Sequence, residues 1–391
     1  MTGPRILVLC DSVDRVGGTE SYLSRVLPAL AARGADVRVV ARRIVDPGAF
    51  GLPATEIRWG VDDEAPDAGA AREVRDAIER VRPDVVVTSN VHDARVMAAA
   101  RTAPKLVVRV HDNRLFCPQG DRQYPHFPAP CTLAMATTTC LANALVRGCV
   151  AGPNARTLRM LRSRQALQRE VLLADRLIVS SHFVAGICST NGVPSARLAL
   201  VPPPFAGSIA ASARPARDRV LFAGRLERDK GLASLIRALS RIEPERRPEL
   251  VVAGAPTSQS RALPALATRL GVDAAFLGKL STPELTRAID GSTLVAVPSL
   301  WPEPFGLMGI ESFARGRPVV AYGVGGIPEW MGAAGLLVRR GDERTFARAI
   351  EIALRPERWN AFSRAALAQA AAYRGDDHAA AFLAVIASIG A

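Results

Sequence analysis

Two glutamates eight positions apart, Glu303 and Glu311, flank a predicted helix start and offer the clearest chemistry in the chain. If this helix begins near Phe305, Glu303 lies in the loop before it and Glu311 lies about two turns into it. Gly306 leaves the first backbone N–H groups uncrowded, and a helix N-terminus of this kind suits a phosphate. The carboxylates would accept hydrogen bonds from sugar hydroxyls, so the stretch predicts a nucleotide-sugar site. The alternative is an ordinary strand–helix unit with both glutamates in solvent.

A second loop, Gly224 to Gly231, carries Arg225 and Lys230 between a predicted strand and a helix that begins near Leu232. Arginine offers a two-pronged fork to phosphate oxygens, and lysine offers a compact positive charge. Together they would neutralise a leaving diphosphate. The alternative is a basic loop on a basic protein.

Two further candidates follow predicted strands in the first half of the chain. His111 and Asp112 come at the end of a strand over residues 106–111, and Gly17 and Gly18 follow a strand over residues 5–10. Ligands of doubly wound sheets bind at the carboxyl ends of the strands. The glycines allow close backbone approach before a helix capped by Thr19, although a plain tight turn explains them equally well. The loop is not a G-x-G-x-x-G fingerprint, so a nicotinamide cofactor is not expected.

The run Glu303-Pro304-Phe305-Gly306-Leu307, followed by Glu311, resembles the E-x7-E motif of retaining GT-B glycosyltransferases of family 4, the group 1 type. Pro-Ser before it and Val-Gly-Gly-Ile-Pro-Glu after it fit the same family, as does Gly-Arg-x4-Lys-Gly at 224–231. The resemblance covers most of the chain. Val-Pro-Pro-Pro-Phe stands where the family often has Val-Pro-Asn-Gly, which leaves the base-side or hinge contacts open.

This resemblance implies an α/β protein with the GT-B fold, in which two Rossmann-like, doubly wound parallel-sheet domains face each other across a cleft. It implies a hexosyltransferase (EC 2.4) of the kind used in cell-envelope polysaccharide biosynthesis. The donor would be a nucleotide-diphosphate sugar, most often a UDP- or GDP-sugar. The acceptor would be a glycan, a lipid-linked molecule or a small molecule, and the sugar would keep its configuration.

The resemblance also assigns roles to residues. Arg225 and Lys230 would stabilise the leaving diphosphate, Glu303 would bind the donor sugar, and Glu311 would bind the ribose. His111 would face the sugar from the first domain, with Asp112 orienting its ring or binding the acceptor. No D-x-D pair is placed to hold a metal, so we expect catalysis to need no cofactor. The expected donor-binding set is Gly17, Gly18, Phe305, Gly306, Leu307 and Glu311.

Four of the six cysteines, Cys117, Cys131, Cys140 and Cys149, fall in a loop-rich segment over residues 113–152. Clustered cysteines in a cytoplasmic protein bind metal more often than they pair. Their spacings are wide, however, and no C-x-x-C is present. Some enzymes of the resembling family carry a cysteine-bearing insertion here. A structural zinc site, disulfide pairing and buried free thiols all stay open.

The net charge of +13 calls for a negatively charged partner. No nucleic-acid-binding motif is present, so a phosphate-bearing substrate or an anionic membrane surface is favoured over nucleic acid. The basic amphipathic helix predicted over residues 154–173 could face such a membrane or the acceptor, or be an ordinary surface helix. Without a signal peptide or an apolar run of membrane-spanning length, the protein is expected in the cytoplasm, peripheral at the inner face of the membrane.

A length of 391 residues suggests two domains. Strands alternate with helices throughout, as in doubly wound sheets. We expect an acceptor-side domain over 1–205, a linker over 206–219, a donor domain over 220–372, and a last helix over 373–391 that crosses back to the first domain.

Two rival functions use the same fold. A non-catalytic or membrane-associated sugar-nucleotide-binding protein would be expected to have lost Arg225, Lys230 or Glu303, all of which are present. A sugar-nucleotide epimerase is the other rival. The sequence does not identify the donor sugar, its base, the acceptor or the oligomeric state.

Overall fold

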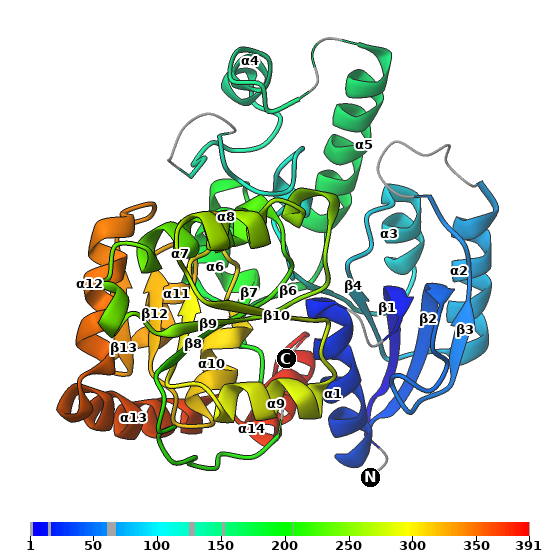
Figure 1. Cartoon of the computed structure of the whole chain (residues 1–391). Coiled ribbons are helices and arrows are strands. Elements are labelled where there is room, and N and C mark those ends of the chain that lie inside the picture. Colours follow the sequence, from blue (N-terminus) through cyan, green and yellow to red (C-terminus); the bar gives the residue numbers. More distant parts are fainter. Residues whose placement is uncertain are drawn as a thin grey trace. The chain divides into compact units, whose positions relative to one another are not determined.

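The computed structural model describes residues 3–14, 17–60, 68–124, 130–150, 152, 154–205 and 207–390. The chain divides into two compact units (Figure 1). Unit 1 comprises Met1–Pro204 and Gly375–Ala391, and unit 2 comprises Phe205–Arg374. Each unit is a parallel sheet with helices on both faces, which confirms the expected pair of Rossmann-like domains. No helix in the described ranges is long and apolar enough to cross a membrane.

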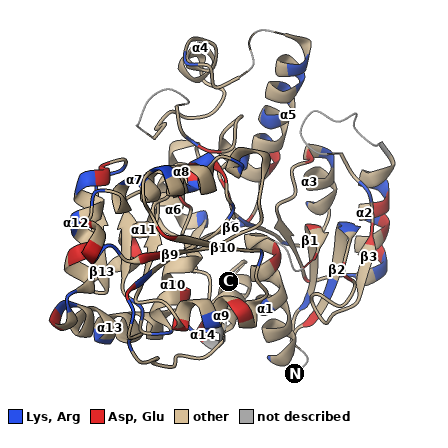
Figure 2. Cartoon of the chain, viewed as in Figure 1, with Lys and Arg blue, Asp and Glu red and all other residues tan. Residues whose placement is uncertain are grey.

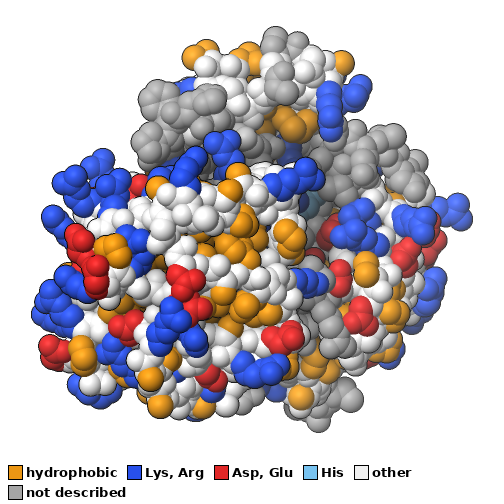
Figure 3. Space-filling view, viewed as in Figure 1, with side chains coloured by type: hydrophobic (Ala, Val, Ile, Leu, Met, Phe, Trp, Pro, Cys, Tyr) orange, Lys and Arg blue, Asp and Glu red, His pale blue; other side chains and the backbone are white. Residues whose placement is uncertain are grey.

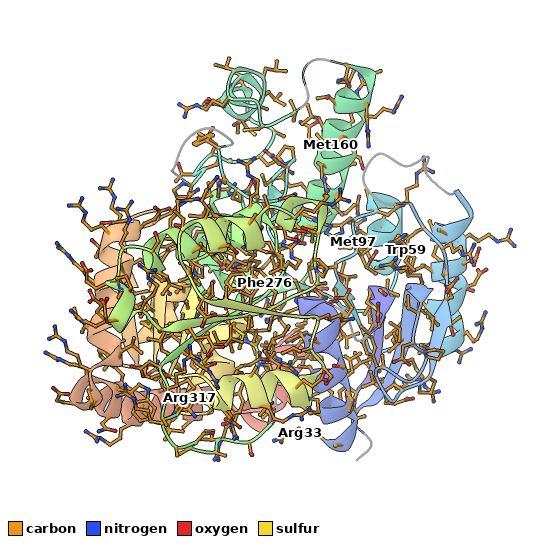
Figure 4. The ribbon with its side chains drawn as sticks, viewed as in Figure 1. Arg33, Trp59, Met97, Met160, Phe276 and Arg317 are labelled. Carbon is orange, nitrogen blue, oxygen red and sulfur yellow. The ribbon has the colours of Figure 1, made fainter. Side chains whose placement is uncertain are left out.

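Unit 1 is built on a seven-stranded sheet in the order β3-β2-β1-β4-β5-β6-β7. Strands covered on both faces need apolar side chains at every position, and residues Ile6–Cys10 of β1 follow this rule. Its Leu7 and Leu9 join the core that contains Trp59 and Met97, both labelled in Figure 4. Alternate β1 residues pack on the opposite face with helices α1 and α14. The strands of unit 1 are β1 (Arg5–Val13), β2 (Asp36–Ile44), β3 (Ala54–Glu56), β4 (Val85–Ser89), β5 (Leu106–Arg109), β6 (Arg176–Val179) and β7 (Leu198–Leu200). Its helices are α1 (Gly18–Ala32), α2 (Ala68–Val81), α3 (Ala94–Ala100), α4 (Thr138–Val146), α5 (Ala155–Leu172), α6 (His182–Thr190) and α14 (Gly375–Ala387).

Unit 2 repeats the design with six parallel strands in the order β10-β9-β8-β11-β12-β13. Val220 and Phe222 of β8 face one core and Leu221 faces the other, so the period of two is again visible. The strands of unit 2 are β8 (Arg219–Ala223), β9 (Glu249–Ala253), β10 (Ala274–Gly278), β11 (Leu294–Val297), β12 (Val319–Tyr322) and β13 (Gly335–Val338). Its helices are α7 (Leu232–Leu239), α8 (Leu263–Arg269), α9 (Thr282–Asp290), α10 (Leu307–Phe313), α11 (Ile327–Met331), α12 (Glu343–Leu354) and α13 (Pro356–Ala370).

The described residues 207–218 of the segment expected to be a linker, 206–219, belong to unit 2. Arg317 is fully buried and donates a hydrogen bond from Nη2 to the carbonyl of Ala213, 2.8 Å away (Arg317 is labelled in Figure 4). The backbone N–H of Ala210 donates to Ala314, 2.9 Å away. These bonds explain how a segment without a periodic apolar face is held in place.

The starts of α9 and α1 show one capping prediction that is confirmed and one that is wrong. The Ser281–Glu284 pair forms the predicted capping box of α9, with the N–H of Ser281 2.7 Å from the Glu284 carboxylate. Thr19, predicted to cap the first helix, does not: Gly17 is the N-cap, at φ 117°, and α1 begins at Gly18. The Thr19 hydroxyl instead accepts a hydrogen bond from Asn90, 2.8 Å away.

Candidate functional site

In unit 2 the loops that follow β8 and β11 meet because these strands are neighbours in the sheet. The carbonyl of Asp229 accepts hydrogen bonds from the backbone N–H groups of Leu300, at 2.7 Å, and Trp301, at 3.3 Å. Gly231 has φ 75°, and a methyl group there would lie 1.9 Å from the carbonyl oxygen of Pro298. Only glycine fits this approach, so the two loops are fixed against each other by backbone.

Lys230 and Glu303 face each other where these loops meet. The Lys230 ammonium donates to Oε1 of Glu303 at 2.6 Å, and the Ser299 hydroxyl donates to the same oxygen at 2.6 Å. The ammonium also lies 5.0 Å from the centre of the Trp301 ring, within cation–π range. Two residues separated by 73 positions in the chain, both predicted as site residues, thus form one charged pair.

Glu303 is only 8% exposed. Burial by itself would raise its pKa, but the Lys230 charge and the hydrogen bonds from Lys230 and Ser299 outweigh burial and hold the pKa below its ordinary value. Glu303 is therefore ionised at neutral pH. A buried, ionised carboxylate is a strong acceptor for hydroxyl groups.

The Gly-Gly turn after β12 holds the backbone of Glu303. The N–H of Gly326 donates to the Glu303 carbonyl at 2.8 Å. Gly325 has φ 60°, and a methyl group on it would lie 2.1 Å from that carbonyl oxygen and 2.6 Å from the Glu303 nitrogen. The glycines noted in the sequence thus serve to position Glu303.

Arg225 lies in the same loop as Lys230 but has different partners. Its guanidinium pairs with Glu227 and lies 3.6 Å from Asp229. Its side chain is 60% exposed, so it can turn toward an arriving anion at small cost.

Helix α10 begins two residues later than predicted. Gly306, at φ 90°, is its N-cap and Leu307 its first residue, so Glu311 lies about one turn into the helix, not two. Phe305 stays outside the helix because its carbonyl accepts the Trp330 indole N–H and its ring packs edge-on against Tyr373. Gly306, Leu307 and Glu311 therefore follow Glu303 within one short loop and one helical turn.

In unit 1 the expected residues gather at the carboxyl ends of β1, β4 and β5. His111 lies two residues beyond β5, and its Nε2 is 2.8 Å from the hydroxyl of Ser89, the last residue of β4. Asn90 follows Ser89 and bonds to the first turn of α1, next to Gly17 and Gly18. The structure thus brings His111 and the Gly-Gly turn to the same edge of the sheet.

The side chain expected to orient His111, Asp112, is directed elsewhere. Its carboxylate accepts the backbone N–H of Arg114 at 2.8 Å and lies 3.9 Å from Nε2 of His92. The neighbours of His111 are instead Ser89 and Tyr22, whose ring meets it edge-on at 4.9 Å. Nothing local in the sequence pointed to either.

Burial, reinforced by the charge of Arg109, lowers the pKa of His111 from 6.5 to about 3. His378 is lowered from 6.5 to about 3 by the same two causes. Both imidazoles are therefore neutral at physiological pH. A neutral His111 can donate or accept a hydrogen bond but carries no charge of its own to a substrate.

The lowered pKa values of His111 and His378 lead us to expect that the folded chain loses stability in acid. Below about pH 6.5 the unfolded chain takes up protons that the folded chain refuses until about pH 3, so the free energy of unfolding should fall as pH drops through this window. Each unit of pKa difference is worth about 1.4 kcal/mol. Urea unfolding of the intact chain at pH 7, 6, 5 and 4 should show a shallower loss in His111→Gln than in wild type. The exposed His182→Gln is the control, and equal slopes in all three would contradict the prediction.

The cysteines of the segment over 113–152 are free thiols. In the ranges that the structure describes, which leave out 125–129 and 151, no three His, Cys, Asp or Glu side chains converge to hold a metal ion. A structural zinc site at Cys117, Cys131, Cys140 and Cys149, one of the three alternatives for this segment, stays a prediction. Burial raises the pKa of Cys117, Cys140 and Cys149, which keeps these thiols protonated at neutral pH.

Two protein families match the chain. The family described as "Glycosyl transferase 4-like domain" matches residues 17–204, and "Glycosyl transferases group 1" matches residues 217–355. The chain is 36% identical over 239 residues to the D-inositol 3-phosphate glycosyltransferase of Mycolicibacterium paratuberculosis, a match that covers 56% of this chain and 53% of that protein. The corresponding protein of Mycobacterium sp. strain KMS is 35% identical over 204 residues, covering 47% and 46%. The chain spans about half the length of the curated relatives it matches.

Solved structures share the fold over nearly the whole chain. Anabaena HepE in complex with UDP superposes with a TM-score of 0.72 and 21% identity, covering 98% of this chain and 100% of that one. A glycosyltransferase from Rickettsia africae has a TM-score of 0.73 and 13% identity, covering 99% and 98%. At these identities the likeness establishes the fold.

Proposed function

We propose that this chain, which matches two glycosyltransferase families and has the GT-B fold, moves a sugar from a nucleotide-diphosphate donor to an acceptor with retained configuration. The observation that carries the proposal is the Lys230–Glu303 pair, largely shielded from solvent, at the carboxyl ends of β8 and β11. It combines a cation suited to a diphosphate with a carboxylate suited to sugar hydroxyls, 2.6 Å apart.

In this proposal the donor lies against unit 2. Lys230 and the exposed Arg225 oppose the negative charge that grows on the leaving diphosphate, the kind of electrostatic effect that often dominates catalysis. Glu303 accepts hydrogen bonds from the transferred sugar and Glu311 from the ribose. The backbone N–H groups of Gly306 and Leu307 add short-range donors. The neutral His111 and the Gly17–Gly18 turn contact the donor from unit 1.

Support for the donor class comes from two sources. The similar HepE structures hold UDP and UDP-glucose, which favours a uridine diphosphate sugar here. The net charge of +13 favours a phosphate-bearing acceptor, as do the names of the inositol phosphate glycosyltransferases. A glycan, lipid-linked or small-molecule acceptor is within the proposal.

The testing experiment is a thermal-shift panel of UDP, GDP, ADP and their sugar conjugates. A ligand at 100 times its dissociation constant should stabilise the native chain by about 2.7 kcal/mol. We expect a UDP-sugar to raise the melting temperature, with or without EDTA. If no nucleotide shifts the melting temperature, the proposed nucleotide-sugar site on unit 2 is wrong.

Product analysis separates the proposed reaction from its rivals. With an acceptor, NMR of the new glycosidic bond should show the donor's anomeric configuration. Conversion of the donor sugar without acceptor would identify an epimerase, and binding without any turnover would identify a non-catalytic sugar-nucleotide-binding protein.

We further propose that this reaction takes place at the anionic, cytoplasmic face of a membrane. Leu145 and Val146 at the end of α4 are 50% and 86% exposed, and Leu158 of α5 is 48% exposed. Arg156, Arg159 and Arg162 lie on the same helix as Leu158, and Figure 2 shows Lys and Arg along α5. Figure 3 shows hydrophobic and basic side chains together on this part of unit 1. Apolar side chains with adjacent cations suit an interface with acidic lipids.

Flotation with vesicles tests this placement. The chain should float with phosphatidylglycerol-containing vesicles but not with phosphatidylcholine alone, and salt should weaken the binding. Leu145→Ser combined with Val146→Ser should reduce it, whereas Val45→Ser, at a similarly exposed apolar residue, should not. Equal flotation of both variants would exclude this surface as the docking site.

A further inference from the structure

The C-terminal helix α14 brings a histidine into the interior of unit 1 beside the His111 site. Nε2 of His378 lies 2.9 Å from the hydroxyl of Tyr22 on α1, across 356 positions of sequence. The Tyr22 ring in turn meets the His111 ring edge-on, with centres 4.9 Å apart. Tyr22 and His378 are 3% and 5% exposed, so neither side chain is available to solvent.

Chemistry fixes the direction of these hydrogen bonds. Nδ1 of His378 lies 2.7 Å from the carbonyl oxygen of Pro202, which can only accept, so Nδ1 carries the proton and donates. A neutral imidazole then has a lone pair on Nε2, which accepts the Tyr22 hydroxyl hydrogen. The Tyr22 ring is thereby held at its far end in a single orientation.

Arg109 contacts a face of the Tyr22 ring. Its side chain is 3% exposed, its Nη1 donates to the carbonyl of Val201 at 2.8 Å, and its guanidinium carbon lies 4.8 Å from the centre of the Tyr22 ring. A buried cation stacked on a tyrosine is stabilised by the ring electrons. Its charge also opposes protonation of both His111 and His378.

We propose that Tyr22, Arg109 and His378 are positioning residues for His111, so that helix α14 is part of the reacting site and not only a brace for the sheet. The proposal rests on the proposed function, in which His111 contacts the donor sugar. Tyr22 contacts the imidazole edge-on, and the Ser89 hydroxyl lies 2.8 Å from its Nε2, so these two contacts restrict the orientation of the ring. The other charged or titratable groups that act on His111 are Arg109, His378, Asp112 and His92.

Packing alone does not call for this arrangement. The face of the sheet that α14 covers is otherwise apolar, with Phe382, Ile386 and Ile389 of the C-terminal segment in its core. Placing a tyrosine, a histidine and an arginine there requires each polar group to find a partner, a requirement that a leucine would avoid. The hydrogen bonds of Tyr22 and His378, and that of Arg109 Nη1, favour one geometry of this cluster, and an imidazole that contacts the donor sugar needs one geometry.

The test uses the full-length chain and three variants. Tyr22→Phe removes the hydroxyl and keeps the ring, His378→Phe removes the acceptor, and Arg109→Met removes the buried charge. Ile386→Ala is the matched control, because it loosens the apolar packing of α14 without touching the polar groups. The imidazole of His111 is observed by NMR after nitrogen-15 labelling of histidine and assigned with His111→Gln, and sugar transfer is measured in parallel.

We expect Tyr22→Phe and His378→Phe to change the His111 resonances and to lower kcat about 10- to 100-fold with little change in KM. Arg109→Met should raise the pKa of His111. Ile386→Ala should lower the melting temperature and leave both the His111 resonances and kcat as in wild type. If Tyr22→Phe and His378→Phe keep wild-type His111 resonances, the proposal is wrong whatever their activity. The NMR arm needs no substrate, so a failure of the proposed transferase function would be seen separately.

Discussion

Replacing Lys230 with methionine is expected to reduce sugar transfer by about 100- to 1,000-fold, the usual loss when one preorganised electrostatic donor is removed. The effect is large because Lys230 has two tasks. It faces the proposed diphosphate, and it is the cation 2.6 Å from the buried Glu303 carboxylate. Steady-state kinetics with a saturating donor would measure the loss, and Lys279→Met, at an exposed lysine of the same unit, is the control.

The same variant should be less stable in a pH-dependent way. Breaking a buried ion pair by removing one partner typically costs about 3–5 kcal/mol. In wild type Glu303 has a lowered pKa and adds stability at neutral pH; in the variant its pKa rises, and protonation relieves the lone charge. The stability deficit should therefore shrink as pH falls from 7 toward 4. Adding Glu303→Gln should recover stability but not activity, whereas a deficit independent of pH would show that the pair is not what the lysine stabilises.

Gly325→Ala is expected to destabilise unit 2 by several kcal/mol and to abolish donor binding. The new methyl group would lie 2.1 Å from the carbonyl oxygen of Glu303 and would sit at φ 60°, where a non-glycine residue is strained by about 1 kcal/mol or more. The new Cβ is attached to the backbone and the Glu303 oxygen is itself a backbone atom, so no side-chain rotation can relieve the clash and Glu303 must move. Urea unfolding and nucleotide thermal shift would report the two losses.

The chain provides a matched control two residues away. A methyl group on Gly323 would have its nearest neighbour at 3.8 Å, an ordinary contact. Gly323→Ala should therefore retain stability and donor binding. If both variants behave alike, the turn does not position Glu303 through this contact.

The fold could be predicted because its signals are local. Runs such as Ile6–Cys10 are apolar at every position, as strands buried on two faces must be, and the Ser281–Glu284 capping box marks a helix start within four residues. Lys230 and Glu303 were found as separate motifs, and the sheet order places them together.

What could not be predicted depends on distant partners. Phe305 is kept out of α10 by Trp330, and Asp112 is drawn away from His111 toward Arg114 and His92. Thr19 loses its capping role to Gly17 and bonds to Asn90 instead. The contact of Tyr22 with His378 joins opposite ends of the chain and leaves no periodic trace in either segment.

The bond between Pro202 and His378 has a mechanical consequence. The chain leaves unit 1 after Pro204 and re-enters it at Gly375, so both crossings start within a few residues of this bond. In unit 2 the backbone N–H of Phe205 donates to the carbonyl of Tyr373, 3.4 Å away, so a second hydrogen bond joins the same two segments. Two hydrogen bonds thus join the two crossing segments. Pro202, Pro203 and Pro204, whose φ angles are fixed, stiffen the first of these segments. Within unit 1, a displacement of Pro202 is passed to Tyr22, and through it to His111, by a single histidine, His378.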